Sequence, residues 1–262
     1  MKPQKMFILL LFLALMVAPV RGVLAEGGEG NVGLSIDDEN EEIDAFFEEE
    51  ESTDPLESVN RVFFEVNDKL YFWILKPVNN VYMVAVPLDF RQCIGNFFDN
   101  LAAPVYVVNN LLQGKVADAG IGLSRFLINS TVGVLGLGDP ALRSFGLEPK
   151  PEDFGQTLGV WGMGEGVYLC LPIIGPLTVR DSLGFAGNVA VHPGNYVTTN
   201  FVEGAAYYSA DKLNMLSLNP DLYEDMKRYS LDPYISMRQV YLEYRRNKVL
   251  DKAVQNDIIN EF

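Results

Sequence analysis

His192 is the chain's single histidine and the first residue to consider for chemistry, because histidine is the usual general base near neutral pH. It stands before Pro193, and no serine, cysteine or carboxylate accompanies it at a recognisable motif spacing. The sequence also has no G-x-S-x-G elbow, no Walker-type phosphate loop and no H-E-x-x-H motif. We therefore expect a protein that is not an enzyme, and a hydrolase that uses His192 is a minor alternative.

Two cysteines and one charged pair are the other groups to weigh. Cys93 and Cys170 lie in apolar surroundings, where they either pair in an oxidising compartment or stay as buried thiols. Their spacing matches no metal site, so we expect no metal and no cofactor. Arg180 and Asp181 form a charged pair in an apolar setting. This pair either caps a hairpin and starts the next helix, or contacts a polar lipid head group.

A glycine-rich turn lies at the centre of an unusually apolar stretch. Residues 154–179 contain one ionisable residue, Glu165, which is flanked by Gly162, Gly164 and Gly166. The limbs on either side are too short to span a bilayer, so we predict a hairpin that dips into a membrane or lines a cavity. A core hairpin of an ordinary soluble domain is the alternative. The glycines favour a site that needs close approach or movement, since they cost backbone entropy elsewhere.

The elements around this turn are predicted to be mostly helical. Four helix starts place an Asp or Asn before a proline suited to the first helical turn: Asp54-Pro55, Asp139-Pro140, Asn219-Pro220 and Asp232-Pro233. Apolar residues recur at helical spacing from Asp54 up to Pro77, where we expect the first helix to end and the next one to open. Short helices follow up to Gly114, then an amphipathic helix over 115–129 and a solvated one from Tyr234. Strand-like alternation is scarce.

The N-terminus reads as a secretory signal peptide over residues 1–25. Lys2 and Lys5 precede the short apolar run Met6–Val17, and Val23-Leu24-Ala25 resembles a cleavage site. An uncleaved anchor helix is the alternative, but the run is shorter than the roughly 20 residues that span a bilayer. We therefore expect an exported protein.

Charge is concentrated directly after this signal. Glu26 to Asp54 holds thirteen acidic residues and no basic one, so we predict that residues 26–53 are a disordered acidic spacer. The rest of the chain, Pro55 to Phe262, has 22 acidic and 17 basic residues. This part of the chain has no excess of basic residues, which excludes nucleic-acid binding as its function. Its length suits one domain, over residues 54–262.

Several segments together carry a family resemblance. They are DPLESVNR (54–61), LKPV (75–78), NFFDNLAAPVYVVNNLLQG (96–114), RFLINSTVGVLGLGD (125–139), EDFGQTLGVWGMGEGVYLCLPIIGPLTVRD (152–181) and DPY (232–234). In this order, from about Asp54 to Arg246, they resemble the MlaA/VacJ family. The opening D-P-L-E-x-x-N-R, combined with F-G-x-T-L-G-x-W-G and L-P-x-x-G-P-x-x-x-R-D, makes the match specific.

The resemblance implies an all-α fold: a compact, ring-like arrangement of short amphipathic helices with a glycine-turn helical hairpin. Such proteins lie in the inner leaflet of a Gram-negative outer membrane, commonly beside a trimeric porin. They take phospholipid mislocalised in the outer leaflet through an amphipathic channel and pass it to a periplasmic carrier protein. Carried over by position, the gating loop falls on Gly162, Gly164 and Gly166, and the first helix places Asn60 and Arg61 near the channel.

One departure from the family pattern concerns membrane attachment. Members are usually lipoproteins with an acylated cysteine at the cleavage site, whereas no cysteine precedes Cys93 here. We therefore expect an unlipidated protein, held at the periplasmic leaflet of the outer membrane by its hairpin and apolar helix faces. The alternative is a soluble periplasmic helical scaffold or interaction protein without lipid transport.

Overall fold

The computed structural model describes residues 54–198 and 200–250. The predicted signal peptide (1–25) and acidic spacer (26–53) lie outside the described residues. The chain divides into two units, Met1–Pro55 and Leu56–Phe262, and the second unit contains every helix and strand discussed below.

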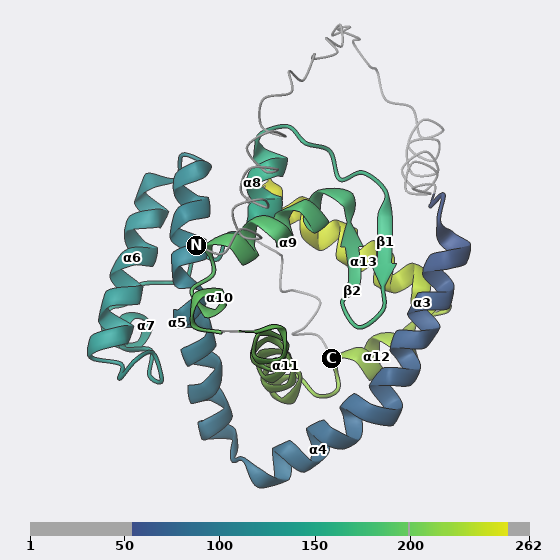
Figure 1. Cartoon of the computed structure of the whole chain (residues 1–262), viewed down its shortest axis with the longest axis horizontal. Helices are drawn as coiled ribbons and strands as arrows, with labels where there is room; N and C mark the ends of the chain where they lie inside the picture. Colours follow the sequence, from purple (N-terminus) through teal and green to yellow (C-terminus); the bar gives the residue numbers. More distant parts are fainter. Residues whose placement is uncertain (1–53, 199, 251–262) are drawn as a thin grey trace, which may run out of the picture. The chain divides into compact units, whose positions relative to one another are not determined.

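Helices make up most of this unit, which confirms the predicted all-α class (Figure 1). In chain order the elements are α3 (Glu57–Leu70), the π-helical turn η1 (Tyr71–Leu75), α4 (Lys76–Ala85), α5 (Leu88–Leu112), α6 (Val116–Thr131), α7 (Pro140–Phe145), α8 (Phe154–Val160), β1 (Tyr168–Leu171), β2 (Gly175–Thr178), α9 (Val179–Val191), α10 (Gly194–Val197), α11 (Phe201–Leu218), α12 (Leu222–Tyr229) and α13 (Pro233–Val249).

Two of the four predicted caps form. The side chain of Asp139 accepts a hydrogen bond from the Leu142 N–H at the start of α7, and that of Asp232 accepts from the first turn of α13. Helix α3 instead begins at Glu57 without a side-chain cap, and α12 begins at Leu222 in the same way. The aspartate–proline pair is therefore a local signal that works where the aspartate directly precedes the helix.

The helical runs around Pro77 and Pro104 are longer than predicted. The helical run does not stop before Pro77, because η1 joins α3 to α4 with helical backbone angles throughout. The expectation that Pro77 opens the next helix is confirmed, because it falls in the first turn of α4, where a missing N–H is tolerated. Likewise, α5 is one helix that contains Pro104 rather than two short ones. Helix α6 matches its predicted range to within two residues at each end.

The predicted helical hairpin is corrected by the structure. The limb before the glycines is helical (α8), but the limb after them is β1, which pairs antiparallel with β2 from Tyr168 opposite Thr178 to Leu171 opposite Gly175. An isolated two-stranded hairpin is marginal in water. The strand is stabilised here because its side chains pack on α13, in a buried cluster that includes Cys170 and Tyr234.

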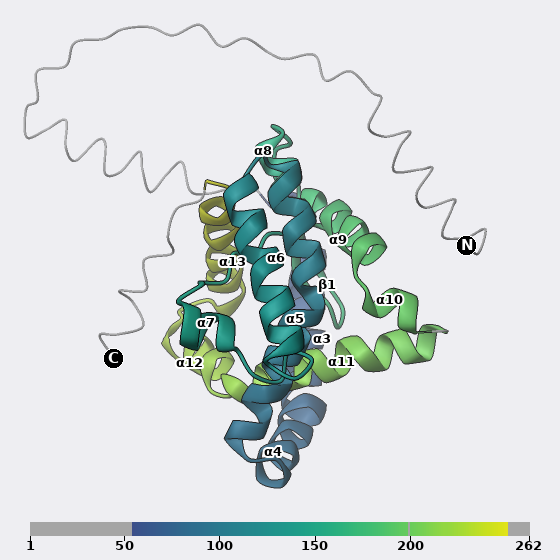
Figure 2. The same ribbon diagram turned by 90° about the vertical axis from the view of Figure 1, so that its left-hand side faces the viewer.

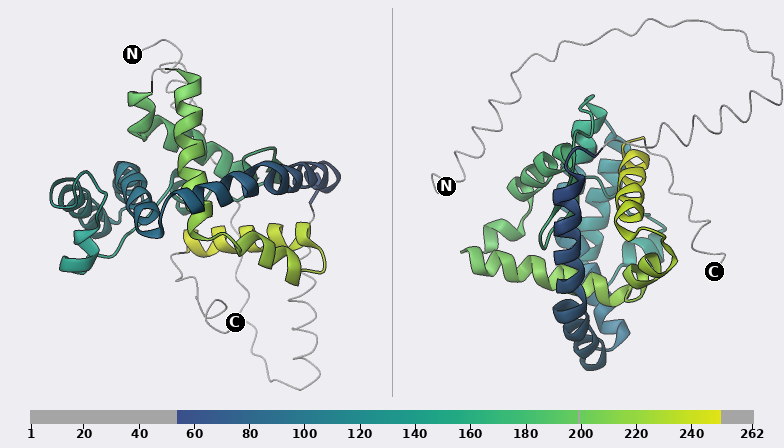
Figure 3. Two further views of the ribbon diagram at one scale, coloured as in Figure 1. Left: turned by 90° about the horizontal axis from the view of Figure 1, so that it is seen from below. Right: turned by 90° about the vertical axis from the view of Figure 1, so that its right-hand side faces the viewer.

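The ring-like arrangement is confirmed within this unit. Contacts between neighbouring elements lead from α3 through η1 to α4, α11, α5, α8 and α9, and then through β2 and β1 back to α3. Helix α6 packs against α5 on the side away from α11 (Figures 1 and 2). Helices α12 and α13 lie on one side of the α3–α4 run and most of α11 on the other (Figure 3). The hairpin therefore completes the circuit beside α3.

Candidate functional site

The free edge of β1 is held by α3, and Asn60 makes the first of two contacts. Its side-chain Nδ2 donates to the Tyr168 carbonyl at 3.1 Å, and its Oδ1 accepts from the Cys170 N–H at 2.9 Å. Only 2% of Asn60 is exposed. The asparagine amide therefore acts as a neighbouring strand would, satisfying one donor and one acceptor of β1 in a buried setting.

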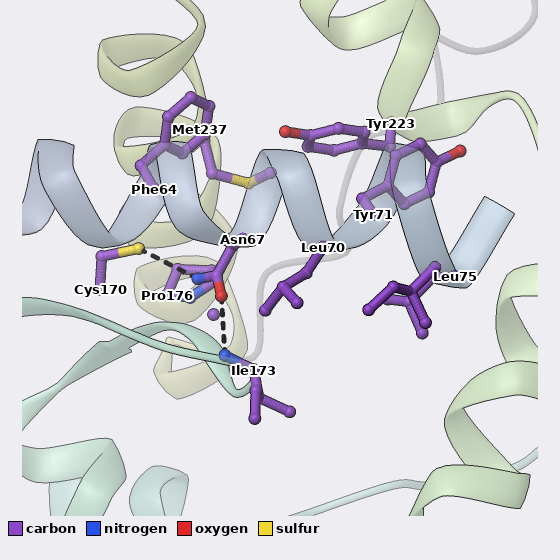
Figure 4. A pocket seen from close by; sticks show the side chains of 12 residues that line it. Phe64, Asn67, Leu70, Tyr71, Leu75, Cys170, Ile173, Pro176, Tyr223 and Met237 are labelled. Carbon is purple, nitrogen blue, oxygen red and sulfur yellow. Dashed lines mark hydrogen bonds between the residues drawn. The ribbon is translucent and has the colours of Figure 1, made fainter.

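Asn67 repeats this contact two helical turns later, at the tip of the hairpin. Its Nδ2 donates to the Leu171 carbonyl at 2.9 Å. Its Oδ1 accepts from the Ile173 N–H at 2.7 Å, a bond drawn in Figure 4. Residues seven apart lie on the same face of a helix, so one face of α3 aligns both amides with the strand. Asn60 was predicted from the sequence and Asn67 was not, although the seven-residue spacing is visible in the sequence.

Arg61 joins α3 to the start of α13. Its guanidinium lies 2.7 Å from the Glu57 carboxylate and 2.8 Å from that of Asp232, and it stacks over the Tyr234 ring at 4.6 Å. The hydrogen bond from Arg61 lowers the pKa of Asp232, which also caps α13. The structure thus gives Arg61 a definite set of partners in the wall of the unit.

The glycine loop connects α8 to β1. Gly162 and Gly166 have φ values of +92° and +70°, a backbone region that side chains with a Cβ rarely adopt. A Cβ on Gly166 would also meet Val179 at 3.0 Å, whereas a Cβ on Gly164 would meet nothing within 4 Å. The outer two glycines are therefore required by the loop conformation, and the central one lies in open space.

Glu165 holds the C-terminal end of this loop in place. Its carbonyl accepts from the Arg180 N–H at 3.2 Å, and its carboxylate lies 3.3 Å from the half-exposed guanidinium of Arg246. The single ionisable residue of the apolar stretch is thus paired with α13 instead of being left without a counter-charge.

A buried ionic cluster holds α8, α9 and α13 together. The Arg245 guanidinium bridges two carboxylates, contacting Asp153 at 2.6 and 2.9 Å and Asp181 at 2.7 and 3.0 Å. The Tyr241 hydroxyl donates to Asp181 at 2.7 Å, and Arg180 lies 3.5 Å from the same carboxylate. Burial alone would raise the pKa of Asp153, but the hydrogen bonds and charge of Arg245 lower it. Asp153 therefore stays ionised near neutral pH.

Arg180 and Asp181 therefore have different surroundings despite being adjacent. Asp181 belongs to the ionic cluster, and its N–H donates to the Thr178 hydroxyl at the start of α9. Arg180 is 4% exposed, and its Nη2 has no hydrogen-bond partner in the described part of the chain. The pair was predicted from the sequence, whereas Asp153 and Arg245 were not, because both are far from it in the chain.

Close backbone approach reinforces the ionic cluster. A Cβ on Gly184 of α9 would lie 2.4 Å from the Gly155 nitrogen of α8, and one on Gly187 would lie 2.7 Å from the Phe154 ring. Two helices this close leave no room to slide without separating. The base of the glycine loop is therefore rigid.

His192 and the two cysteines have structural surroundings. The His192 Nδ1 accepts from the Gly194 N–H at 3.0 Å, its ring packs on Tyr207 and Tyr208, and burial lowers its pKa. Cys93 and Cys170 are both free in the structure, which favours unpaired thiols over a disulfide.

A pocket of about 360 Å³ lies between η1, the hairpin tip, α12 and α13 (Figure 4). Most of its lining is aliphatic or aromatic. The lining residues are Phe64, Asn67, Leu70, Tyr71, Ile74, Leu75, Cys170, Ile173, Gly175, Pro176, Tyr223 and Met237. Its volume lies within the range of roughly 300–1,000 Å³ that is typical of small-molecule sites.

Exposed apolar residues follow one another along η1, α4 and the start of α5. We call this set the apolar stripe: Trp73, Ile74, Leu75, Val78, Val81, Val84, Leu88 and Phe90. The hairpin tip adds Ile173, 87% exposed, and Ile174. Extended exposed apolar surface marks contact with a membrane or a partner. Among the described residues, none of the helices combines the length and apolar character needed to cross a bilayer.

Comparison with known proteins places this geometry in a family. The family model described as MlaA lipoprotein matches residues 52–248. A relative from Escherichia coli (strain K12), named intermembrane phospholipid transport system lipoprotein MlaA, is 31% identical over 200 residues, which cover 73% of this chain and 76% of the relative. A relative of the same name from Haemophilus influenzae is 29% identical over 227 residues, 80% of this chain and 88% of its own length.

A solved structure supports the same assignment at the level of the fold. It comes from work described as the structural basis for maintenance of bacterial outer membrane lipid asymmetry. It superposes with a TM-score of 0.68 at 32% sequence identity and covers 75% of this chain and 99% of its own. With the family model matching most of the domain, this chain belongs to the MlaA lipoprotein family.

Proposed function

We propose that this protein is a component of an intermembrane phospholipid transport system that maintains outer-membrane lipid asymmetry. It removes mislocalised phospholipid from the outer leaflet through an amphipathic channel and passes it to a periplasmic carrier, without covalent chemistry of its own. The observation that carries the proposal is the match across residues 52–248 to a family whose named relatives belong to such a system.

Membrane attachment follows from the exposed apolar surface. The apolar stripe and the hairpin tip would lie among acyl chains of the periplasmic leaflet, in the manner of a monotopic protein. This attachment requires no acyl group, in keeping with the absence of a cysteine before Cys93. The remaining partners that we propose are a trimeric porin in the membrane and a soluble carrier in the periplasm.

The glycine loop is the part that we propose moves as a head group passes. Its base at α8 is fixed by the ionic cluster and its exit is fixed by Glu165 and Asn60, so movement is confined to residues 162–164. Gly164, with open space around it, is the position where a change of stiffness does not also create a clash.

A matched pair of variants at Gly164 tests this function in cells that lack the wild-type chain. Gly164→Pro fixes the φ angle of the loop, whereas Gly164→Ala adds a methyl group in open space and keeps the loop mobile. We expect Gly164→Pro to change the amount of surface-exposed phospholipid and outer-membrane permeability, and Gly164→Ala to match wild type. Unchanged surface phospholipid in a normally expressed Gly164→Pro strain would exclude the gating role.

A further inference from the structure

The pocket beneath η1 is separate in sequence and in lining from the glycine loop. We propose that it binds a single acyl chain of a membrane lipid while the head group stays outside. The inference rests on the proposed function, because it names where the apolar part of the transported lipid is held.

The first wall of the pocket comes from the π-helical turn. Tyr71, Ile74 and Leu75 all belong to η1, and Leu70 directly precedes it. π-Helical turns are rare and occur frequently at functional sites, since the extra residue per turn redirects side chains. Leu70, just before the turn, and Leu75, at its end, both line the same hollow (Figure 4).

The opposite wall comes from the hairpin tip and α13. Asn67 fixes the distance between α3 and the tip, because its amide is bonded to the backbone on both sides of Pro172. Met237 adds a flexible apolar side chain that adapts to an irregular ligand. Burial raises the pKa of the Cys170 thiol, so this lining group is neutral and not activated as a nucleophile.

The hydroxyl groups of the lining point to partners outside the hollow. Tyr71 donates to Glu224 at 3.2 Å, and Tyr223 donates to Asp68 at 2.8 Å. Burial and the nearby Glu224 carboxylate raise the pKa of Tyr71 to about 12, so its phenol is neutral at physiological pH. Because these polar groups are engaged elsewhere, the pocket favours hydrocarbon and disfavours a charged head group.

The mouth of the pocket is apolar and opens on the apolar stripe. Ile74 and Leu75 belong to both surfaces and are 54% and 45% exposed, and Ile173 is 87% exposed on the opposite rim. A lipid acyl chain that enters here passes from the membrane interior into the pocket without crossing a polar barrier. A volume of about 360 Å³ is near the lower end of ligand sites, roughly 300–1,000 Å³, so it suits one chain better than a complete diacyl lipid.

The test measures binding of cis-parinaric acid, a fluorescent fatty acid, to the full-length protein. Ile74→Trp places a large ring at the mouth, and Val78→Trp is its control, since Val78 is similarly exposed (48%) on the same stripe and lies outside the pocket lining. We expect Ile74→Trp to weaken binding about tenfold or more, the scale of discrimination in apolar pockets, and Val78→Trp to bind as wild type.

Two further measurements make the result decisive. Bound parinaric acid should slow alkylation of Cys170 in a Cys93→Ser background, which reports occupancy without filling the pocket. A lysophosphatidylethanolamine should compete with the probe as well as palmitate of the same chain length does. Competition by palmitate alone would assign the pocket to free fatty acid and overturn the proposal for membrane lipid.

Other outcomes also contradict the proposal. Equal affinity of wild type, Ile74→Trp and Val78→Trp, with no protection of Cys170, would place the bound chain elsewhere. Binding that emerges only after removal of residues 251–262 would assign the pocket to the chain's own C-terminus. None of these results requires the transport function to fail, because that function is tested separately by the Gly164 pair.

Discussion

Two regions on either side of the glycine loop are held together by opposite means. The α8–α9–α13 junction relies on buried ions, with Arg245 between Asp153 and Asp181, and on backbone contact at Gly155 and Gly184. The α3–hairpin junction relies on neutral amides and leaves an apolar pocket of about 360 Å³.

This difference assigns separate mechanical roles to the two regions. Buried ion pairs tolerate little change in geometry, since each charge is costly when its partner moves away. Apolar contacts and neutral hydrogen bonds tolerate adjustment at lower cost. We infer that the ionic junction is a fixed base, and that the hairpin side is where the molecule adapts to a lipid.

The largest expected effect is from Arg245→Met at the ionic junction. The change leaves the buried Asp181 carboxylate and the half-buried Asp153 carboxylate without their main counter-charge, which should lower the free energy of unfolding by about 3–5 kcal/mol. The neighbouring Arg246→Met is the control, because the half-exposed Arg246–Glu165 pair contributes only about 0–1 kcal/mol. Denaturant unfolding measures both variants, and equal losses would contradict the division into a fixed and an adaptable region.

The next effect is at the hairpin side. Asn60→Leu leaves the Tyr168 carbonyl and the Cys170 N–H unpaired in a buried setting, at a cost of about 1–3 kcal/mol. Asn67→Leu should cost less, since the Ile173 N–H is exposed at the tip and water can replace the lost bond. Unfolding free energies, with hydrogen exchange at Cys170 and Ile173, measure this order. A larger loss for Asn67→Leu would contradict it.

The residues that could be predicted from the sequence are those whose partners are close to them in the chain. The Asp139 and Asp232 caps were predicted because a cap and its helix are adjacent in the chain. The partnership of Asp153 with Arg245 joins residues 92 positions apart, so it depends on the fold and has no local pattern.

The hairpin and the π-helical turn also could not be predicted from local sequence patterns alone. Glycines and low charge predicted a hairpin centred on the glycine loop, but that loop leads from α8 into β1, and the hairpin forms later, between β1 and β2. The segment after the glycines is a strand because Asn60 and Asn67 of a distant helix satisfy the edge of β1. The run through Pro77 continued because η1 precedes it, and a π-helical turn has no distinct sequence pattern. Contacts between elements far apart in the sequence therefore outweighed the local sequence pattern at both positions.

Acid should weaken the ionic junction more than the hairpin side. The pKa of Asp153 is lowered in the folded state, so its contribution to stability is complete above the unfolded value of about 3.9 and is lost as the pH falls below that value. In Arg245→Met the same carboxylate has no such stabilisation to lose. The melting temperatures of wild type and Arg245→Met should therefore converge between about pH 4 and 2, whereas a constant difference would contradict the assignment.

The smallest effect concerns the thiols. Cys93→Ser should leave the melting temperature within about 1 °C of wild type, because Cys93 is unpaired and half-buried. In the wild-type chain Cys93 should react with a maleimide faster than Cys170, since burial raises the pKa of the Cys170 thiol. Equal or faster reaction of Cys170, or a disulfide between the two cysteines on a non-reducing gel, would contradict the buried position of Cys170 on the hairpin side.

The central claim is that this chain carries phospholipid at the outer membrane. The most direct measurement is fractionation of cell membranes, followed by purification of the chain from the outer-membrane fraction and mass spectrometry of the lipid that remains bound. The account predicts that the protein fractionates with the outer membrane and retains phospholipid. Recovery in the soluble periplasmic fraction without lipid would contradict it and support a soluble scaffold instead.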